Sequence, residues 1–273
     1  MGGQQLLIIL SLLIPVPIAT LLLLYISRRR APVDLPLALL VIAGGIWCGF
    51  YALELALESY SAKLLAGRIQ YFAFVLAPLA WFMLGMELRG WLSRIGLREY
   101  TMLLIIPGMT LGLVFTSGSH DFFWRSKELV EFNGLRHFQN TYGPGFWIHL
   151  VYSYLLNIAA VILAVSSFLK SDSFYSGQRL TIAIAMVMPW LTNIIYVFRL
   201  TDFTIDLTPF AIIISSLILV LGVFRYRFGN LVPVVRERIM AEMHDAVLVL
   251  DDSMHVVDFN TALQELFPQK EII

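Results

Sequence analysis

The sequence has 273 residues, of which 59% are hydrophobic and only 14% are charged, and its mean hydropathy is +0.78. Soluble domains are roughly 45–50% apolar, so a water-soluble globular protein is excluded. The 19 basic residues balance the 19 acidic ones without forming a basic stripe among aromatic residues, so nucleic acid is not an expected partner. The single cysteine, Cys48, has no cysteine or histidine at ligand spacing, so we expect no metal site and no cofactor.

Apolar stretches long enough to cross a bilayer recur along the chain. Backbone groups in lipid must be satisfied within their own segment, and no stretch alternates with the period of two typical of barrel strands. We therefore predict an all-α membrane protein, a seven-transmembrane-helix bundle that forms one domain over residues 1–224 and contacts membrane lipids. The predicted spans run from Leu6 to Ile26, Leu35 to Leu57, Leu64 to Leu88, Tyr100 to Ser117, Gly145 to Leu169, Arg179 to Leu200 and Leu207 to Phe224.

Arginines near the ends of these spans predict the orientation of the bundle. They follow the first span at residues 28–30, the third at residues 89–98 and the seventh at residues 225–227. Basic residues accumulate on the cytoplasmic side of membrane proteins, which places the N-terminus outside and the C-terminus in the cytoplasm.

Two glycine pairs at a spacing of four residues lie within spans. Gly45 and Gly49 belong to the second span, and Gly108 and Gly112 belong to the fourth. Small residues at this spacing allow close approach of helix backbones, and we expect packing within the bundle more than a dimer contact.

The stretch from Gly118 to Pro144 is polar and aromatic, and at about 27 residues it is longer than usual connections. We interpret it as a folded or functional loop on the outer face of the membrane.

The chain from residue 225 onward is less apolar and again charged. Residues 225–243 predict a short cytoplasmic linker helix, on which Phe228, Val232, Val235 and Ile239 form a heptad-like stripe. Residues 244–273 then predict a strand from Ala246 to Leu250, a turn, a second strand from His255 to Phe259, and a helix beginning near Asn260.

Motifs in this order resemble a known family over nearly the whole chain. The third span carries Gly67-Arg68-Ile69-Gln70-Tyr71, Pro78 and Trp81, and the outer loop carries His120-Asp121-Phe122-Phe123-Trp124. Further fragments are Tyr142-Gly143-Pro144-Gly145-Phe146-Trp147, Gln178-Arg179, Pro189, Asn193, Asp206-Leu207-Thr208-Pro209, Val232-Pro233, Arg236, residues 243–251 and residues 256–260. Together they resemble the N-terminal seven-transmembrane sensor region of bacterial and archaeal histidine kinases, also found on diguanylate cyclases, followed by the start of an α/β PAS domain.

The resemblance implies a transmembrane signal receptor of a two-component system in the cytoplasmic membrane of a prokaryote. It implies a homodimer through the cytoplasmic helix, with Pro233, Val235 and Ile239 relaying the signal to the truncated PAS portion, residues 244–273. The alternative for the stripe is packing on its own bundle or at the membrane surface. The chain carries no catalytic module of the family, and His244-Asp245 precedes a strand pattern where a phosphoacceptor histidine would need a helix.

Ionisable side chains inside spans are costly and tend to mark a function or a buried pair. Glu54 of the second span and Arg68 of the third lie at matching depths near the outer end of their helices, so we expect a salt bridge. The pair is either a structural clamp or a ligand contact.

A second polar group lies at the same outer level. His149 and Tyr152 share one face of the fifth span, as Asn193 and Tyr196 do in the sixth. With His120, Trp124 and Tyr142 of the outer loop, they would line or cap a pocket for a small molecule, lipid or peptide. The alternative is a set of interhelical hydrogen bonds and interfacial aromatic residues.

Two other classes of membrane protein remain as alternatives. A retinal protein needs a buried lysine, and the seventh span has none. A small transporter, or a seven-helix ligand-binding protein without a signalling role, remains open, although a transporter typically shows repeated halves that this sequence lacks.

Overall fold

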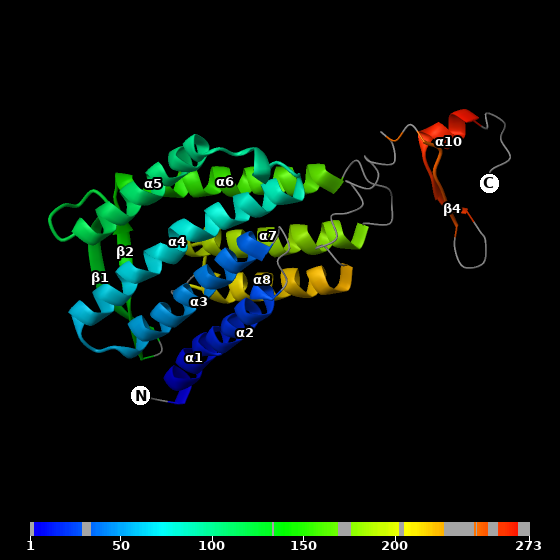
Figure 1. The fold of residues 1–273 in the computed structure, drawn as a ribbon. Coiled ribbons are helices and arrows are strands. Elements are labelled where there is room, and N and C mark those ends of the chain that lie inside the picture. The colour runs from blue at the N-terminus through cyan, green and yellow to red at the C-terminus, as the bar shows by residue number, and fades with distance from the viewer. Residues whose placement is uncertain are drawn as a thin grey trace. The chain divides into compact units, whose positions relative to one another are not determined.

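The computed structural model describes residues 3–28, 34–132, 134–168, 176–201, 205–226, 243, 245–250 and 256–266. The chain divides into two compact units, Met1–Tyr226 and Arg227–Ile273. Helices make up most of the first unit (Figure 1), as predicted. They are α1 (Gly3–Leu13), α2 (Pro15–Ser27), α3 (Asp34–Ala56), α4 (Tyr60–Leu88), the 3-10 turn η1 (Leu92–Arg94), α5 (Leu97–Thr116), α6 (Pro144–Phe168), α7 (Ser176–Val197) and α8 (Thr208–Tyr226).

Apolar helices occupy all the predicted spans. In the described part of the chain, five helical stretches are long and apolar enough to cross a bilayer: Leu6–Ser27, Leu35–Ala56, Tyr60–Leu88, Leu97–Thr116 and Pro144–Ser166. Two shorter apolar stretches, Ile184–Val197 and Thr208–Gly222, lie at the predicted sixth and seventh spans. The fold is therefore consistent with a seven-helix membrane region, and its orientation across the membrane stays a prediction.

The first predicted span consists of two helices. Ile14 separates α1 from α2, and Pro15 and Pro17 follow at once. A proline has no backbone N–H to donate to the preceding turn, but the first turn of a helix needs no such donor. The helix therefore ends and restarts at this point.

Helix α4 begins at Tyr60, before the predicted start at Leu64, because Lys63 is accommodated inside the protein. Its side chain is only 2% exposed. The ammonium donates to the carbonyl oxygens of Glu54 at 2.5 Å, Leu55 at 3.4 Å and Arg136 at 2.7 Å. Lys63 thus joins the last turn of α3 to the segment that follows α5.

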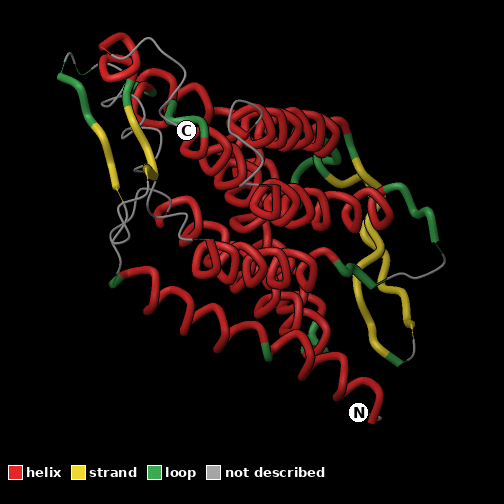
Figure 2. Tube along the Cα trace, turned by 90° about the vertical axis from the view of Figure 1, so that its right-hand side faces the viewer, coloured by secondary structure: helices red, strands yellow, loops and turns green. Residues whose placement is uncertain are grey.

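That segment corrects the prediction of an all-α bundle. The stretch expected to be a loop forms an antiparallel hairpin of β1 (Trp124–Phe132) and β2 (Leu135–Tyr142), with Phe132 opposite Leu135 and an irregularity after Trp124. The hairpin crosses one end of the bundle (Figures 1 and 2). It is folded, as the length of the stretch indicated, but its strands were not predicted.

The hairpin is held by buried side chains on both strands. Trp124, Leu135 and Phe138 are each at most 4% exposed. Trp124 and Leu135 join clusters of aromatic and aliphatic residues of the helices, and the Phe138 ring packs edge-on against the Tyr60 ring of α4, with 5.2 Å between the ring centroids. At its base, the Gly143 N–H donates to the carbonyl of Phe123 at 2.9 Å. A Cβ at position 143 would overlap the Phe122 carbonyl, so only glycine allows this close approach.

The two glycine pairs behave differently. Gly45 and Gly49 face α2, where an added Cβ would lie 3.5 Å from Ala19 and 3.7 Å from a Val16 methyl group. This close packing within the bundle agrees with the prediction. For Gly108 and Gly112 the prediction is wrong, because no atom of the described residues lies within 4 Å of an added Cβ.

The second unit has the predicted order of elements. β3 (Leu248–Leu250) pairs antiparallel with β4 (Val256–Phe259), and α10 (Thr261–Leu266) follows. The buried Asn260 side chain joins them: its oxygen accepts the Val247 N–H at 2.9 Å and the Leu263 N–H at 3.0 Å, and its amide donates to the Asp245 carbonyl at 2.7 Å. The predicted relay residues Pro233, Val235 and Ile239, together with Phe228, Val232 and His244, lie outside the described residues.

Candidate ligand-binding site

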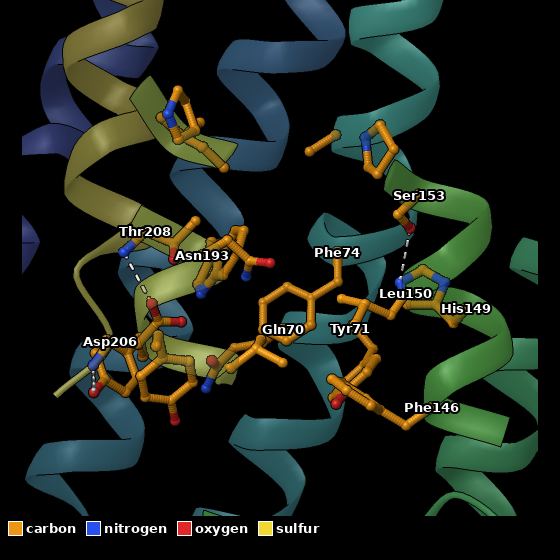
Figure 3. A pocket seen from close by; sticks show the side chains of 18 of the residues that line it. Gln70, Tyr71, Phe74, Phe146, His149, Leu150, Ser153, Asn193, Asp206 and Thr208 are labelled. Atoms are coloured by element: carbon orange, nitrogen blue, oxygen red, sulfur yellow. Dashed lines mark hydrogen bonds between the residues drawn. The ribbon is translucent and has the colours of Figure 1, made fainter. Parts of the chain in front are cut away.

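A cavity of about 140 Å³ lies inside the first unit, between α3, α4, α6, α7 and α8, with the β1–β2 hairpin at one end. Its walls are largely aromatic and its polar groups come from several helices and from both strands (Figure 3). The aromatic residues are Trp47, Tyr51, Tyr71, Phe74, Trp81, Trp124, Phe138, Tyr142, Phe146, Trp190, Tyr154 and Tyr196. The polar residues are Glu54, Gln70, Lys127, His137, Asn140, His149, Ser153, Asn157, Asn193, Asp206 and Thr208.

Most of the predicted ligand-binding residues lie in this lining. They are Glu54, Trp124, Tyr142, His149, Asn193 and Tyr196, which come from α3, the hairpin, α6 and α7. The fold therefore brings α3, α6, α7 and the hairpin together around one space. That these side chains bind a ligand stays a prediction.

Three predicted residues, Arg68, His120 and Tyr152, are not part of the cavity lining. The Tyr152 hydroxyl donates to the Leu103 carbonyl of α5 at 2.6 Å, and its place in the lining is taken by Ser153 and Tyr154. His120 is half-buried; its Nε2 lies 2.9 Å from the Thr116 hydroxyl, and its Nδ1 accepts the Phe122 N–H at 3.3 Å. Tyr152 thus joins α6 to α5, and His120 joins the end of α5 to the residues before β1.

The predicted pairing of Glu54 with Arg68 is wrong. The Glu54 carboxylate, 6% exposed, accepts a hydrogen bond from the Gln70 amide at 2.5 Å. Arg68 donates instead to the Ser117 hydroxyl at 3.3 Å, at the end of α5. Residues three apart share a helix face whereas adjacent residues point about 100° apart, so Gly67 and Gln70 face Glu54 while Arg68 does not.

Lys127 of the hairpin strand β1 acts electrostatically on the Glu54 carboxylate, more strongly than Lys63 does. Its ammonium lies 3.3 Å from the centroid of the Trp124 ring, a cation–π contact. Burial lowers the pKa of Lys127 to about 7, and the Glu54 carboxylate opposes that shift. Burial also lowers the pKa of the neighbouring cavity residue His137, which favours the neutral imidazole.

Asp206 lies directly before α8 and is 5% exposed. Its carboxylate accepts the Thr208 N–H at 2.9 Å, the arrangement of an aspartate that caps a helix, and its own N–H donates to the Tyr51 hydroxyl at 2.9 Å. Burial raises the pKa of Asp206 to about 6. Reasoning from sequence did not select this residue, although Asp206-Leu207-Thr208-Pro209 carries a helix-start pattern that could have located it.

Polar atoms without a partner in the chain concentrate around the cavity. Buried polar groups are normally hydrogen-bonded, so these groups are available to hydrogen-bond a polar ligand or water. Among the described residues that line the cavity, these atoms are Nε1 of Trp47, Trp124 and Trp190, both ring nitrogens of His137, Nδ1 of His149, Oδ1 of Asn140 and Oγ1 of Thr208.

Comparison with family models gives one decisive match. The model described as the N-terminal 7TM region of histidine kinase matches residues 7–233, most of the chain. The chain belongs to this family. Comparison with curated proteins gives no match. This family implies a sensor region of histidine kinases, and its 7TM description agrees with the apolar helices of the first unit.

Proposed function

We propose that this chain is a transmembrane receptor that binds a ligand in the cavity of its 7TM region and relays the binding event to an output module. The observation that supports this function is the cavity itself. It is closed at one end by the hairpin, its walls are aromatic, and buried donors and acceptors without partners surround it. Such a combination is typical of sites that bind small molecules.

The relay runs along the chain from α8 into residues 225–243 and then into the second unit. The β3–β4–α10 arrangement has the order expected for the opening of a PAS domain, which supports that part of the proposal. We infer that the receptor works as a homodimer through its linker helix, in the cytoplasmic membrane of a prokaryote, as the sensor of a two-component histidine kinase.

The orientation can be tested with a thiol reagent that does not cross membranes. Positive charge on one side of the bundle predicts that the hairpin is outside. A cysteine placed at Ser126 in β1 should react on intact cells, whereas a cysteine at Ser253 should react only after lysis. Labelling at position 253 and not at 126 would reverse the proposed orientation.

Ligand sensing can be tested by filling the cavity. The full chain is fused to a histidine kinase core placed after residue 273. Ser153 lines the cavity and is only 7% exposed, so Ser153→Phe puts an aromatic ring into the cavity. Val151→Phe is the matched control, because Val151 is 58% exposed on the same helix.

We expect the fusion to change its autophosphorylation several-fold on addition of culture extract, and Ser153→Phe to remove this response or lock the kinase in one state. Val151→Phe should behave like the parent. If Ser153→Phe and Val151→Phe give the same basal and extract-dependent rates, the cavity is not the sensing site.

A further inference from the structure

We propose that the cavity takes a small molecule carrying a positively charged amine, with Asp206 as the carboxylate that binds the amine. This inference rests on the proposed receptor function and names the chemical class of its ligand.

Of the two carboxylates that line the cavity in the described part of the chain, Asp206 is the one without a cation beside it. Two buried carboxylates line the space, and Glu54 already has the Gln70 amide and the electrostatic attraction of Lys127 and Lys63. Among the residues that the structure describes, no lysine, arginine or histidine lies within 4.0 Å of the Asp206 carboxylate. A buried ion without a counter-ion is unfavourable, so a cationic ligand would gain by supplying one.

The surroundings of Asp206 favour an ammonium group. Its carboxylate is close enough to Tyr51, Tyr71, Tyr142 and Tyr196 to act electrostatically on each of their phenols. Aromatic faces attract cations, and a carboxylate combined with such faces is the usual composition of an ammonium site. An anionic ligand at this position would be repelled by the Asp206 carboxylate, because Lys127, the lysine of the lining, acts on Glu54.

An unpartnered acceptor lies beside this carboxylate. Thr208 is 2% exposed; its backbone N–H donates to the Asp206 carboxylate at 2.9 Å, and its hydroxyl acts on the same carboxylate as a donor, which leaves the hydroxyl oxygen as an acceptor. The Thr208 hydroxyl and the Asp206 carboxylate can therefore accept two N–H groups of one protonated amine.

The opposite wall indicates the rest of the ligand. Figure 3 shows Asp206 and Thr208 on one side of the cavity and His149 with Ser153 on the other, with Phe74 between them. His149 Nε2 lies 3.4 Å from the Ser153 hydroxyl, which leaves Nδ1 for a neutral polar group of the ligand. The cavity of about 140 Å³ is close to the ~150 Å³ that holds a benzene-sized molecule. Small amino alcohols have this size and carry both the amine and the neutral polar group.

The test compares probes of nearly equal shape and different charge, bound to the full chain in lipid nanodiscs. Ethanolamine is paired with neutral 1-propanol and anionic glycolate, and choline is paired with neutral 3,3-dimethyl-1-butanol. Binding is followed by tryptophan fluorescence, because Trp47, Trp124 and Trp190 line the cavity. We expect each cation to bind at least ten-fold more tightly than its neutral partner, and glycolate not to bind.

Two variants locate the amine. Asp206→Asn keeps an acceptor for the Thr208 N–H and should weaken both cations at least ten-fold without changing the neutral probes. Thr208→Val should weaken ethanolamine several-fold but not choline, which has no N–H to donate. Asp121→Asn, an exposed aspartate outside the lining, is the control and should change nothing.

The proposal is overturned if glycolate binds more tightly than ethanolamine, if neither cation binds, or if Asp206→Asn leaves cation affinity unchanged. These outcomes are independent of the kinase fusion. If the cavity controls autophosphorylation but binds glycolate more tightly than ethanolamine, only the proposed amine ligand is contradicted. If Ser153→Phe leaves autophosphorylation unchanged, the receptor function itself is contradicted.

Discussion

The contact between α4 and α6 predicts a large effect from a single methyl group. A Cβ added at Gly85 of α4 would lie 2.7 Å from the carbonyl oxygen of Ala160 in α6 and 2.9 Å from its Cα. This is about 0.7 Å closer than the 3.4 Å at which ordinary contact begins. The obstacle is backbone, so no side chain can rotate away, and Gly85→Ala must push the two helices apart.

Overpacking of this kind costs about 1–3 kcal/mol in well-packed interiors. For a chain of this size the melting temperature falls by roughly 2–4 °C per kcal/mol, so we expect a loss of several degrees. Because α4 and α6 both line the cavity, the same change should also weaken binding of any cavity ligand.

The assay is thermal unfolding of the purified chain in one detergent, with Gly108→Ala as the matched control. Gly108 is also helical, but an added Cβ there meets nothing within 4 Å of the described residues. Alanine is favoured over glycine inside helices by about 0.5–1 kcal/mol, so the control should be as stable as the parent or slightly more stable. Equal melting temperatures for the two variants would refute the close α4–α6 contact.

Three further predictions concern polar groups. Lys63→Met removes three hydrogen bonds to buried carbonyls, so amide hydrogen exchange in the hairpin should become faster; unchanged exchange would mean that Lys63 does not hold it. Gln70→Leu leaves the Glu54 carboxylate without its amide donor and should lower the melting temperature more than Arg68→Ala does; the reverse order would restore the Glu54–Arg68 pair. Burial, with a smaller effect of Glu54, raises the pKa of Asp206 to about 6, so at pH 7 the charged form is unfavourable in the folded chain and Asp206→Asn should be more stable than the parent; as pH falls from 7 to 4, protonation of Asp206 should weaken choline binding and shrink this difference in stability, and a pH-independent difference would contradict this.

Hydropathy was sufficient to locate the helices because each one must bury its own backbone groups in lipid. It was not sufficient for the hairpin. A two-stranded sheet is marginal by itself, and this one depends on Trp124 and Leu135 packing in clusters with distant helices and on Phe138 packing against Tyr60 of α4. That dependence is tertiary, and no local pattern between residues 118 and 144 reports it.

For the site, the sequence indicates how far along its helix each residue lies, but not the direction in which its side chain points. Counting residues from the helix ends placed Glu54 at the right level, where Arg68 and Gln70 were both within reach. Which of them faces Glu54 depends on the rotation of α4 about its axis, and that rotation is fixed by packing against α3 and α6. The same reason explains why Ser153 and not Tyr152 reaches the cavity.

The position of Asp206 and Thr208 at the first turn of α8 gives that helix the geometry of a lever. Its 19 residues span about 28 Å at 1.5 Å per residue, with the cavity at one end and the chain leading out of the first unit at the other. A tilt of about 5° about the cavity end would move the far end by roughly 2.5 Å, which is comparable to the helix displacements that switch other proteins. A ligand bound by the Asp206 carboxylate that tilts α8 by a few degrees would therefore move the cavity end of the helix very little and its far end by several times more.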